Sequence, residues 1–100
     1  MTILQLEHAI SDYQLWKAAF DRDPVKRQHS GVRGHHVLRP VDDPNYVVVD
    51  LEFDDAEQAR AFRHKLDGLW RSRDAAPALA GRPRVRILDT AERREYEARR

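Results

Sequence analysis

The sequence predicts a small α+β domain whose elements follow the order βαββαβ. Three observations support this fold class: short segments with strand patterning, two longer segments with apolar residues at helical spacing, and a turn sequence that joins two of the strands. The chain has 100 residues, which is the size of one small domain, so we expect a single hydrophobic core.

The first strand is expected at residues 2–8, "TILQLEH", where side chains alternate between two faces. A helix should follow within residues 10–20, "ISDYQLWKAAF", because Ser11 and Gln14 have the spacing of a capping box. Pro24 should kink or restart this helix, since proline lacks the backbone donor that a helix interior needs. The apolar stripe of the helix contains Tyr13, Trp16, Ala19 and Phe20.

The central part of the sequence predicts a hairpin followed by a second helix. Residues 34–40, "GHHVLRP", and residues 46–53, "YVVVDLEF", have strand character, and the sequence "VDDPNY" between them has the composition of a turn. Asp54 or Asp55 should cap a helix that extends to the region of Gly68. The apolar stripe of this helix contains Ala59, Phe62, Leu66 and Leu69.

The last part of the sequence predicts a loop at residues 74–83 and a fourth strand at residues 84–89, "RVRILD". Residues 91–100 form a charged tail without an apolar stripe, for which we expect a frayed helix or a disordered end, so the domain should span residues 1–90. This order of elements is the split-βαβ or ferredoxin-like arrangement. It predicts an antiparallel sheet in the order 4-1-3-2 with both helices on one face.

The register of the hairpin decides which side chains face the helices. With a turn at residues 42–45, His36 would lie opposite Leu51 and would share the helix-side face with His8. His35 would then project from the other face. That face mixes apolar and charged residues and has no helix over it, so we expect a second copy of the chain to cover it.

Composition excludes several classes of function. The net charge of +1 gives no strong field for nucleic acid or anionic lipid, and the absence of cysteine excludes disulfides and thiolate chemistry. The longest apolar run is far shorter than the roughly 20 residues that cross a bilayer, and the beginning of the sequence lacks the pattern of a secretory signal. We therefore expect a cytoplasmic protein with no membrane partner.

The histidines do not predict a metal site. His35 and His36 are neighbours on a strand and should point to opposite faces. His8 and His36 would share a face, but strand geometry separates them by about 15 Å. His64 lies among basic residues on the polar side of the second predicted helix.

The open sheet face offers two further interpretations. His35 opposite Glu52 could form an acid–base pair, although such cross-strand pairs ordinarily stabilise a sheet or an interface. An RNA-recognition motif would need aromatic residues on this face, and the corresponding positions hold Val48, Asp50 and Gln5. Nucleic-acid binding is therefore not expected.

Two segments, "DYQLWKAAFD" and "GVRGHHVLRPVDDPNYVVVDLEFDDAEQARAF", together resemble the dimeric α/β-barrel superfamily that includes the antibiotic biosynthesis monooxygenases. The resemblance covers about residues 2–90. It is carried by the aromatic first helix, the strand from Gly31 to Arg39, the "DDPN" turn and the "LEFDDAEQARAF" junction. It implies a homodimer whose two sheets close into a barrel, with a pocket in each subunit between the sheet and the helices.

The resemblance also implies a function. The chain would be a small enzyme without a cofactor, a monooxygenase or a polyketide cyclase, and its substrate would be an aromatic or polyketide-like compound. In such an oxygenase the phenolic substrate donates the electrons for its own oxidation by dioxygen. His36 would be the catalytic residue that accepts or orients the phenolic proton, and Trp70, Trp16 and His8 would bind the substrate.

The residues leave two alternatives open. The chain could be a dimeric module that binds a small apolar ligand without turnover, or a structural or stress-associated dimer with a filled core. An open cavity would distinguish the last alternative from the others. A titratable group of perturbed pKa in that cavity would distinguish an enzyme from a binding module.

Overall fold

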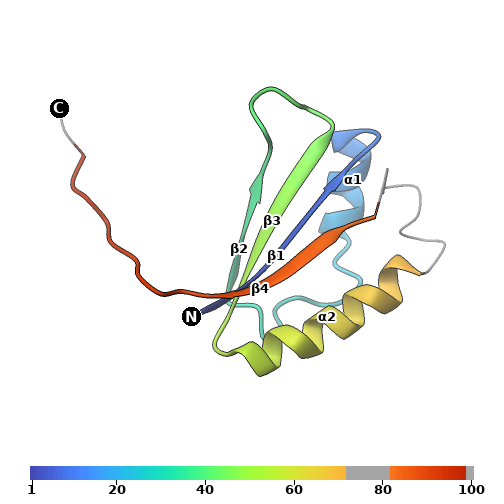
Figure 1. Ribbon diagram of the computed structural model, residues 1–100. Coiled ribbons are helices and arrows are strands. Elements are labelled where there is room, and N and C mark those ends of the chain that lie inside the picture. The colour runs from blue at the N-terminus through green and yellow to red at the C-terminus, as the bar shows by residue number, and fades with distance from the viewer. Residues whose placement is uncertain (72–81, 99–100) are drawn as a thin grey trace.

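The computed structural model describes residues 1–71 and 82–98. Its elements are β1 (Thr2–Ala9), α1 (Tyr13–Asp21), β2 (Gly34–Leu38), β3 (Tyr46–Phe53), α2 (Ala56–Trp70) and β4 (Arg84–Asp89). The strands form one antiparallel sheet in the order β2-β3-β1-β4, and both helices lie on the same side of it (Figure 1). The predicted fold class and sheet order are confirmed.

The core lies between the helices and the two central strands, β1 and β3. Side chains on these strands alternate between buried and partly exposed, so that Leu4 and Leu51, which pair across the strands, both face inward. The ring of Phe62 on α2 packs against Phe53 with 5.5 Å between the ring centroids. The remaining buried apolar residues are Leu6, Ile10, Trp16, Val32, Val47, Val49, Ala59 and Leu66.

Both helices begin at an aspartate. The carboxylate of Asp55 accepts a hydrogen bond from the backbone amide of Gln58 at 2.9 Å, as one of the two predicted caps. In α1 the cap is Asp12, whose carboxylate accepts from the amide of Gln14 at 3.2 Å. The predicted capping box at Ser11 is wrong, because Asp12 is itself extended and is the residue that joins the strand to the helix.

The chain after α1 turns instead of restarting a helix. Asp23 and Lys26 adopt φ angles of 52° and 51°, in the left-handed region that a right-handed helix cannot contain. The Asp23 carboxylate accepts from the amide of Arg27 at 2.9 Å and holds this turn. The predicted continuation of the helix beyond Pro24 is therefore wrong, and the segment between α1 and β2 is irregular.

The register of β2 differs from the prediction by one residue. His36 lies opposite Asp50 and His35 lies opposite Leu51, whereas the prediction paired His36 with Leu51. A shift of one residue moves every side chain of a strand to the other face of the sheet. His35 therefore faces the helices, and His36 projects from the open face, where the predicted pair of His35 and Glu52 does not form.

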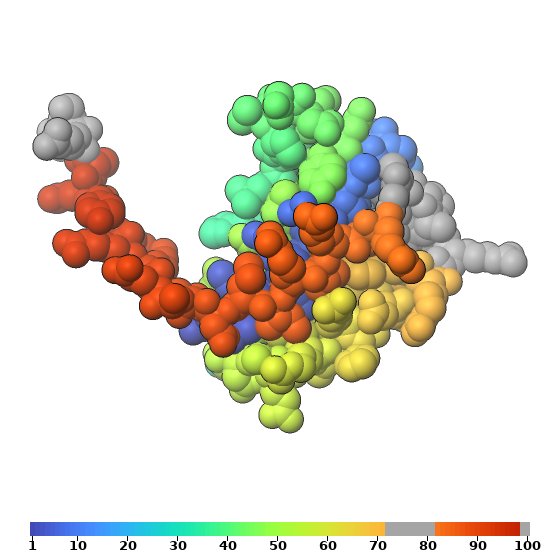
Figure 2. Space-filling view, viewed as in Figure 1, coloured from blue at the N-terminus to red at the C-terminus, as the bar shows by residue number. Residues whose placement is uncertain are grey.

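The C-terminal segment leaves the body of the molecule. Residues 90–98 are exposed, contain no helix or strand, and run away from the sheet after β4 (Figures 1 and 2). Most of the loop predicted at residues 74–83 lies outside the described residues. In the described ranges, no helix combines the length and the apolar character that crossing a membrane requires.

The observed register predicts which engineered cysteines can form a disulfide. The natural sequence contains no cysteine, so any disulfide reports the introduced pair alone. Residues directly opposite on one face have Cβ atoms about 4.5–5.5 Å apart, and mild oxidation should close the pair in His36→Cys/Asp50→Cys. The pair in His36→Cys/Leu51→Cys should stay reduced. Mass spectrometry of the intact chain measures both, and the opposite result would restore the predicted register.

Candidate functional site

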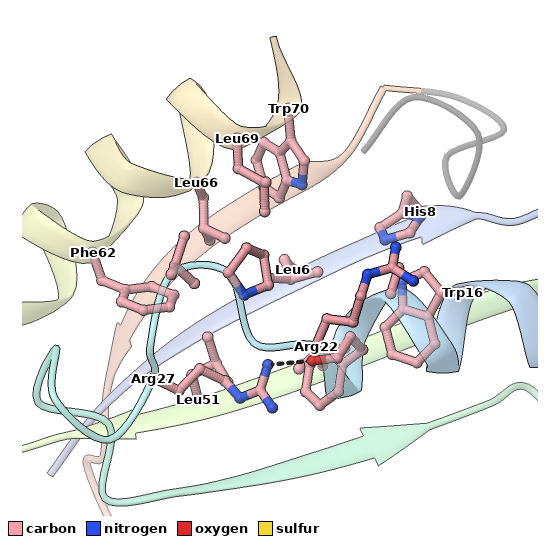
Figure 3. A pocket seen from close by; sticks show the side chains of 15 residues that line it. Leu6, His8, Trp16, Arg22, Arg27, Leu51, Phe62, Leu66, Leu69 and Trp70 are labelled. Atoms are coloured by element: carbon pink, nitrogen blue, oxygen red, sulfur yellow. Dashed lines mark hydrogen bonds between the residues drawn. The ribbon is translucent and has the colours of Figure 1, made fainter. Parts of the chain in front are cut away.

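A cavity of about 470 Å³ lies between the sheet and the two helices. Its floor comes from β1 and β3, one wall from α1 and the following turn, and the other wall from α2 (Figure 3). Most of the lining is apolar, and its polar members are His8, Arg22 and Arg27. An apolar cavity of this size with few polar groups is typical of sites that bind small molecules. The apolar lining consists of Leu6, Trp16, Ala19, Phe20, Pro24, Val25, Val49, Leu51, Phe62, Leu66, Leu69 and Trp70.

Aromatic rings form the α1 wall of the cavity. Trp16 is buried and stacks on Phe20, one helical turn further on, with 5.0 Å between the ring centroids. Trp70 lines the opposite wall from the C-terminal end of α2 and is only partly buried. The two tryptophans of the chain therefore both border the cavity, from different helices. Flat apolar walls of this kind suit a planar aromatic ligand.

His8 is the titratable group at the floor of the cavity. It is the last inward-facing residue of β1, its side chain is buried, and its ring lies 6.3 Å from that of Trp16. Nδ1 lies 2.9 Å from the carbonyl oxygen of Ala9. A carbonyl oxygen can only accept, so Nδ1 carries the hydrogen and Nε2 keeps a lone pair.

Burial lowers the pKa of His8, because desolvation penalises the charged imidazolium. The hydrogen bond to Ala9 acts in the opposite direction but is the weaker influence. His8 is therefore neutral at physiological pH, with Nε2 free to accept a proton. A neutral histidine in an apolar cavity has the properties of a general base.

Two arginines border the cavity at the end of α1. The guanidinium of Arg27 stacks on Phe20, with 3.8 Å from its central carbon to the ring centroid, and donates to the Phe20 carbonyl oxygen at 2.9 Å. It also forms an ion pair with Asp23 at 3.4 Å. Arg22 ends α1, and its side chain is exposed. The aromatic wall is thus held in place by Arg27, while Arg22 contributes an exposed positive charge to the cavity edge.

His35 belongs to the same region but does not line the cavity. Its ring meets the edge of Phe20 at a centroid distance of 5.2 Å. Partial burial lowers the pKa of His35, and the positive charges of Arg27 and Lys17 lower it further. His35 therefore borders the outer side of the aromatic wall as a neutral ring.

The structure brings together three of the four residues that the sequence suggested for the site. Trp16, Trp70 and His8 line one cavity, from three different elements (Figure 3). His36 was expected beside them and is not there. Its side chain is exposed on the open face opposite Asp50, because the register of β2 is shifted by one residue.

Arg22 and Arg27 were not among the site residues predicted from the sequence. Both lie in "FDRDPVKR", which was interpreted only as the place where the first helix kinks or restarts. The available signal was the alternation of acidic and basic residues next to a proline. Such a pattern indicates a charged turn after the aromatic helix, and this turn lies at the edge of the cavity that the helix covers. Among the described residues, no group of three or more histidine and acidic side chains could hold a metal ion.

Comparison with known proteins gives a result at the level of fold. No protein-family model matches the sequence, and no curated protein matches it. SnoaB, a cofactor-independent oxygenase from Streptomyces nogalater, superposes with a TM-score of 0.71 at 13% identity, over 92% of this chain and 94% of that chain. A candidate antibiotic biosynthesis monooxygenase from Deinococcus radiodurans superposes with a TM-score of 0.70 at 16% identity, over 98% and 100% of the two chains.

A third structure of this kind, from Nitrosomonas europaea, gives a TM-score of 0.61 at 18% identity, over 92% of this chain and 100% of that chain. The chain therefore shares the ferredoxin-like fold of these structures. In this fold, function must be argued from the residues of the site, because one architecture supports several activities.

The lowered pKa of His8 predicts a pH dependence of stability. In the unfolded chain His8 takes up a proton near pH 6.5, whereas in the folded chain it does so only at lower pH. Below about pH 6.5 the unfolded state therefore binds more protons than the folded state. The free energy of unfolding should fall as pH decreases through about 6.5 and level off below the folded pKa. Urea denaturation at several pH values measures this.

His8→Gln should reduce this pH dependence without abolishing it, because the pKa of His35 is lowered in the same sense. The control is His64→Gln on the exposed side of α2, which should keep the wild-type pH dependence. An unchanged pH dependence in His8→Gln would show that His8 is not buried as a neutral group.

Proposed function

We propose that the chain is a small cofactor-independent enzyme of the antibiotic biosynthesis monooxygenase or polyketide cyclase type. Its substrate would be a planar aromatic or polyketide-like phenol bound in the cavity under α1 and α2. The observation that carries the proposal is a neutral histidine, His8, at the floor of an apolar cavity of about 470 Å³. The solved structures of similar fold, which include a cofactor-independent oxygenase, support it.

The chemistry assigned to His8 is removal of an acidic proton. Nε2 would accept the proton of a phenol or of its enol form, while Nδ1 stays bonded to the Ala9 carbonyl and stabilises the imidazolium that forms. Trp16 and Trp70 would hold the ring system between them and exclude water. Proton removal is the first step of both oxygenation and aldol cyclisation, so one base serves either reaction.

The oxygenation needs no electrons from the protein. The deprotonated substrate transfers electrons to dioxygen, and a carbon–oxygen bond forms at the electron-rich carbon. The resulting hydroperoxide loses water and leaves a new carbonyl group, so one oxygen atom enters the product and the other becomes water. The substrate supplies all the electrons that dioxygen takes up.

The two alternatives receive less support. A structural dimer with a filled core would have no open space between the sheet and the helices, yet a cavity lies there. A module that only binds an apolar ligand would not need a histidine whose pKa is lowered by burial. The enzyme is therefore the interpretation that uses both features.

The open face of the sheet supports a homodimer. Leu38 and Leu88 on this face are 49% and 38% exposed, and Ile3 and Val48 lie between them on the inner strands. A short polar network shares the face, in which Arg86 donates to Gln5 at 2.8 Å and Gln5 donates to Asp50 at 3.0 Å. We propose that a second copy covers this face, because apolar residues among paired polar groups are typical of dimer interfaces.

The catalytic proposal predicts a difference between two histidines. His8→Gln should lower the turnover of 1,8-dihydroxyanthrone by about 10²-fold, the usual loss for a general base. His36→Gln should keep wild-type turnover, because His36 lies on the opposite face of the sheet. The appearance of the anthraquinone, followed by absorbance in air-saturated buffer, measures both rates. A greater loss of turnover in His36→Gln than in His8→Gln would identify His36 as the base. A wild type without turnover would favour the alternative of a module that only binds its ligand.

The dimer proposal predicts the effect of one charge on the open face. At micromolar concentration the wild type should sediment as two chains, and Val48→Asp should dissociate at higher concentrations than the wild type does. The new carboxylate would be buried close to Asp50 in the interface without a partner. Ala61→Asp, which introduces the same carboxylate on the exposed side of α2, is the control. A wild type that sediments as a single chain would contradict the proposal.

A further inference from the structure

The edge of the cavity carries a positive charge that no described acidic residue neutralises. In the segment that ends α1, Asp21 pairs with Lys17 at 2.5 Å and Asp23 pairs with Arg27 at 3.4 Å. Arg22 lies between these two aspartates in the sequence. None of the described carboxylates lies within ion-pair distance of its guanidinium. Each of the two aspartates in this segment therefore forms an ion pair with a different cation, and Arg22 has no ion-pair partner among the described residues.

Arg22 is positioned to act on a ligand. Its backbone amide closes the last turn of α1 by donating to the carbonyl oxygens of Ala18 and Phe20, so the start of its side chain is fixed. The side chain itself is exposed and lines the same cavity as His8 and Trp16 (Figure 3). The guanidinium can thus approach a ligand at the cavity edge without losing any partner seen in the described structure.

Arg27 cannot serve in the same way. Its guanidinium is already engaged by the Phe20 ring, by the Phe20 carbonyl oxygen and by Asp23. Its side chain is only 16% exposed, so its role is to fix the aromatic wall. The anion-binding capacity of the cavity therefore resides in Arg22.

We propose that the ligand of this cavity carries a carboxylate, which Arg22 binds at the cavity edge while the aromatic body lies between the tryptophans. This inference rests on the proposed function and narrows its substrate class to aromatic or polyketide-like acids. The planar guanidinium can donate two parallel hydrogen bonds to a carboxylate, which a neutral phenol cannot accept. The charge would orient the substrate, with its ionised end at the edge and its reacting hydroxyl toward His8.

Two probes with the same hydroxynaphthalene ring system test the proposal: 6-hydroxy-2-naphthoate, which carries a carboxylate, and 2-naphthol, which does not. Titration calorimetry gives both dissociation constants, and quenching of tryptophan emission gives a second readout, since both tryptophans border the cavity. The wild type should bind the carboxylate about five- to tenfold more tightly, the range expected for a charge-assisted contact at a partly exposed site. The preference should weaken as salt is added.

Three variants separate the role of Arg22 from that of net charge. Arg22→Gln should bring the two affinities together by weakening only the carboxylate, and Arg22→Lys should keep part of the preference because the charge remains without the planar geometry. Arg60→Gln, on the exposed side of α2 away from the cavity, removes the same charge and should keep the full preference.

Equal affinity of the wild type for both probes would overturn the proposal, as would an equal loss in Arg60→Gln. Failure of the wild type to bind either probe would overturn both the ligand cavity and the carboxylate site. The measurement needs no turnover, so it is independent of the reaction. A protein that prefers the carboxylate through Arg22 but oxidises no phenol would contradict the oxygenase alone.

Discussion

Antiparallel pairing of β1 with β3 is the constraint on which the rest of the structure depends. Leu4 lies opposite Leu51 and His8 lies opposite Val47, so one face of this pair is apolar up to its last residue. α2 packs on that face against β1, β3 and β4. α1 covers the same face with the buried ring of Trp16. The cavity thus lies in the space between two helices that cover one face of the sheet.

The same pairing determines the chemistry of the site. Strand alternation turns His8 inward at the edge of the apolar surface, where water is excluded and the imidazolium is disfavoured. The Ala9 carbonyl, on the next residue of β1, selects the tautomer that leaves Nε2 unprotonated. Arg22 supplies the opposite property, an exposed cation at the edge that forms no ion pair with the carboxylates of residues 1–71 and 82–98. A neutral base inside and a positive charge at the edge are the two features that support the proposed ligand, with an acidic hydroxyl at one end and a carboxylate at the other.

The sequence predicted β1, β3 and α2 well, because in each the apolar residues repeat at a spacing that places them on one face, toward the core. β2 was different, since His35 and His36 share one polarity and Val37 and Leu38 share another, so the pattern does not fix the register. In the structure Val37 is partly buried against the core and Leu38 is exposed. The shift of the register by one residue places His36, the expected base, on the open face and not in the cavity. Arg22 was missed because the charged segment around Pro24 was interpreted as a kink or restart of the first helix and not as part of a site.

The most direct test of this account is the crystal structure of the protein with 2-naphthol bound. Naphthol should lie between Trp16 and Trp70, with its hydroxyl within about 3.2 Å of Nε2 of His8. Naphthol bound on the open sheet face beside His36, or a cavity filled by protein side chains, would contradict it.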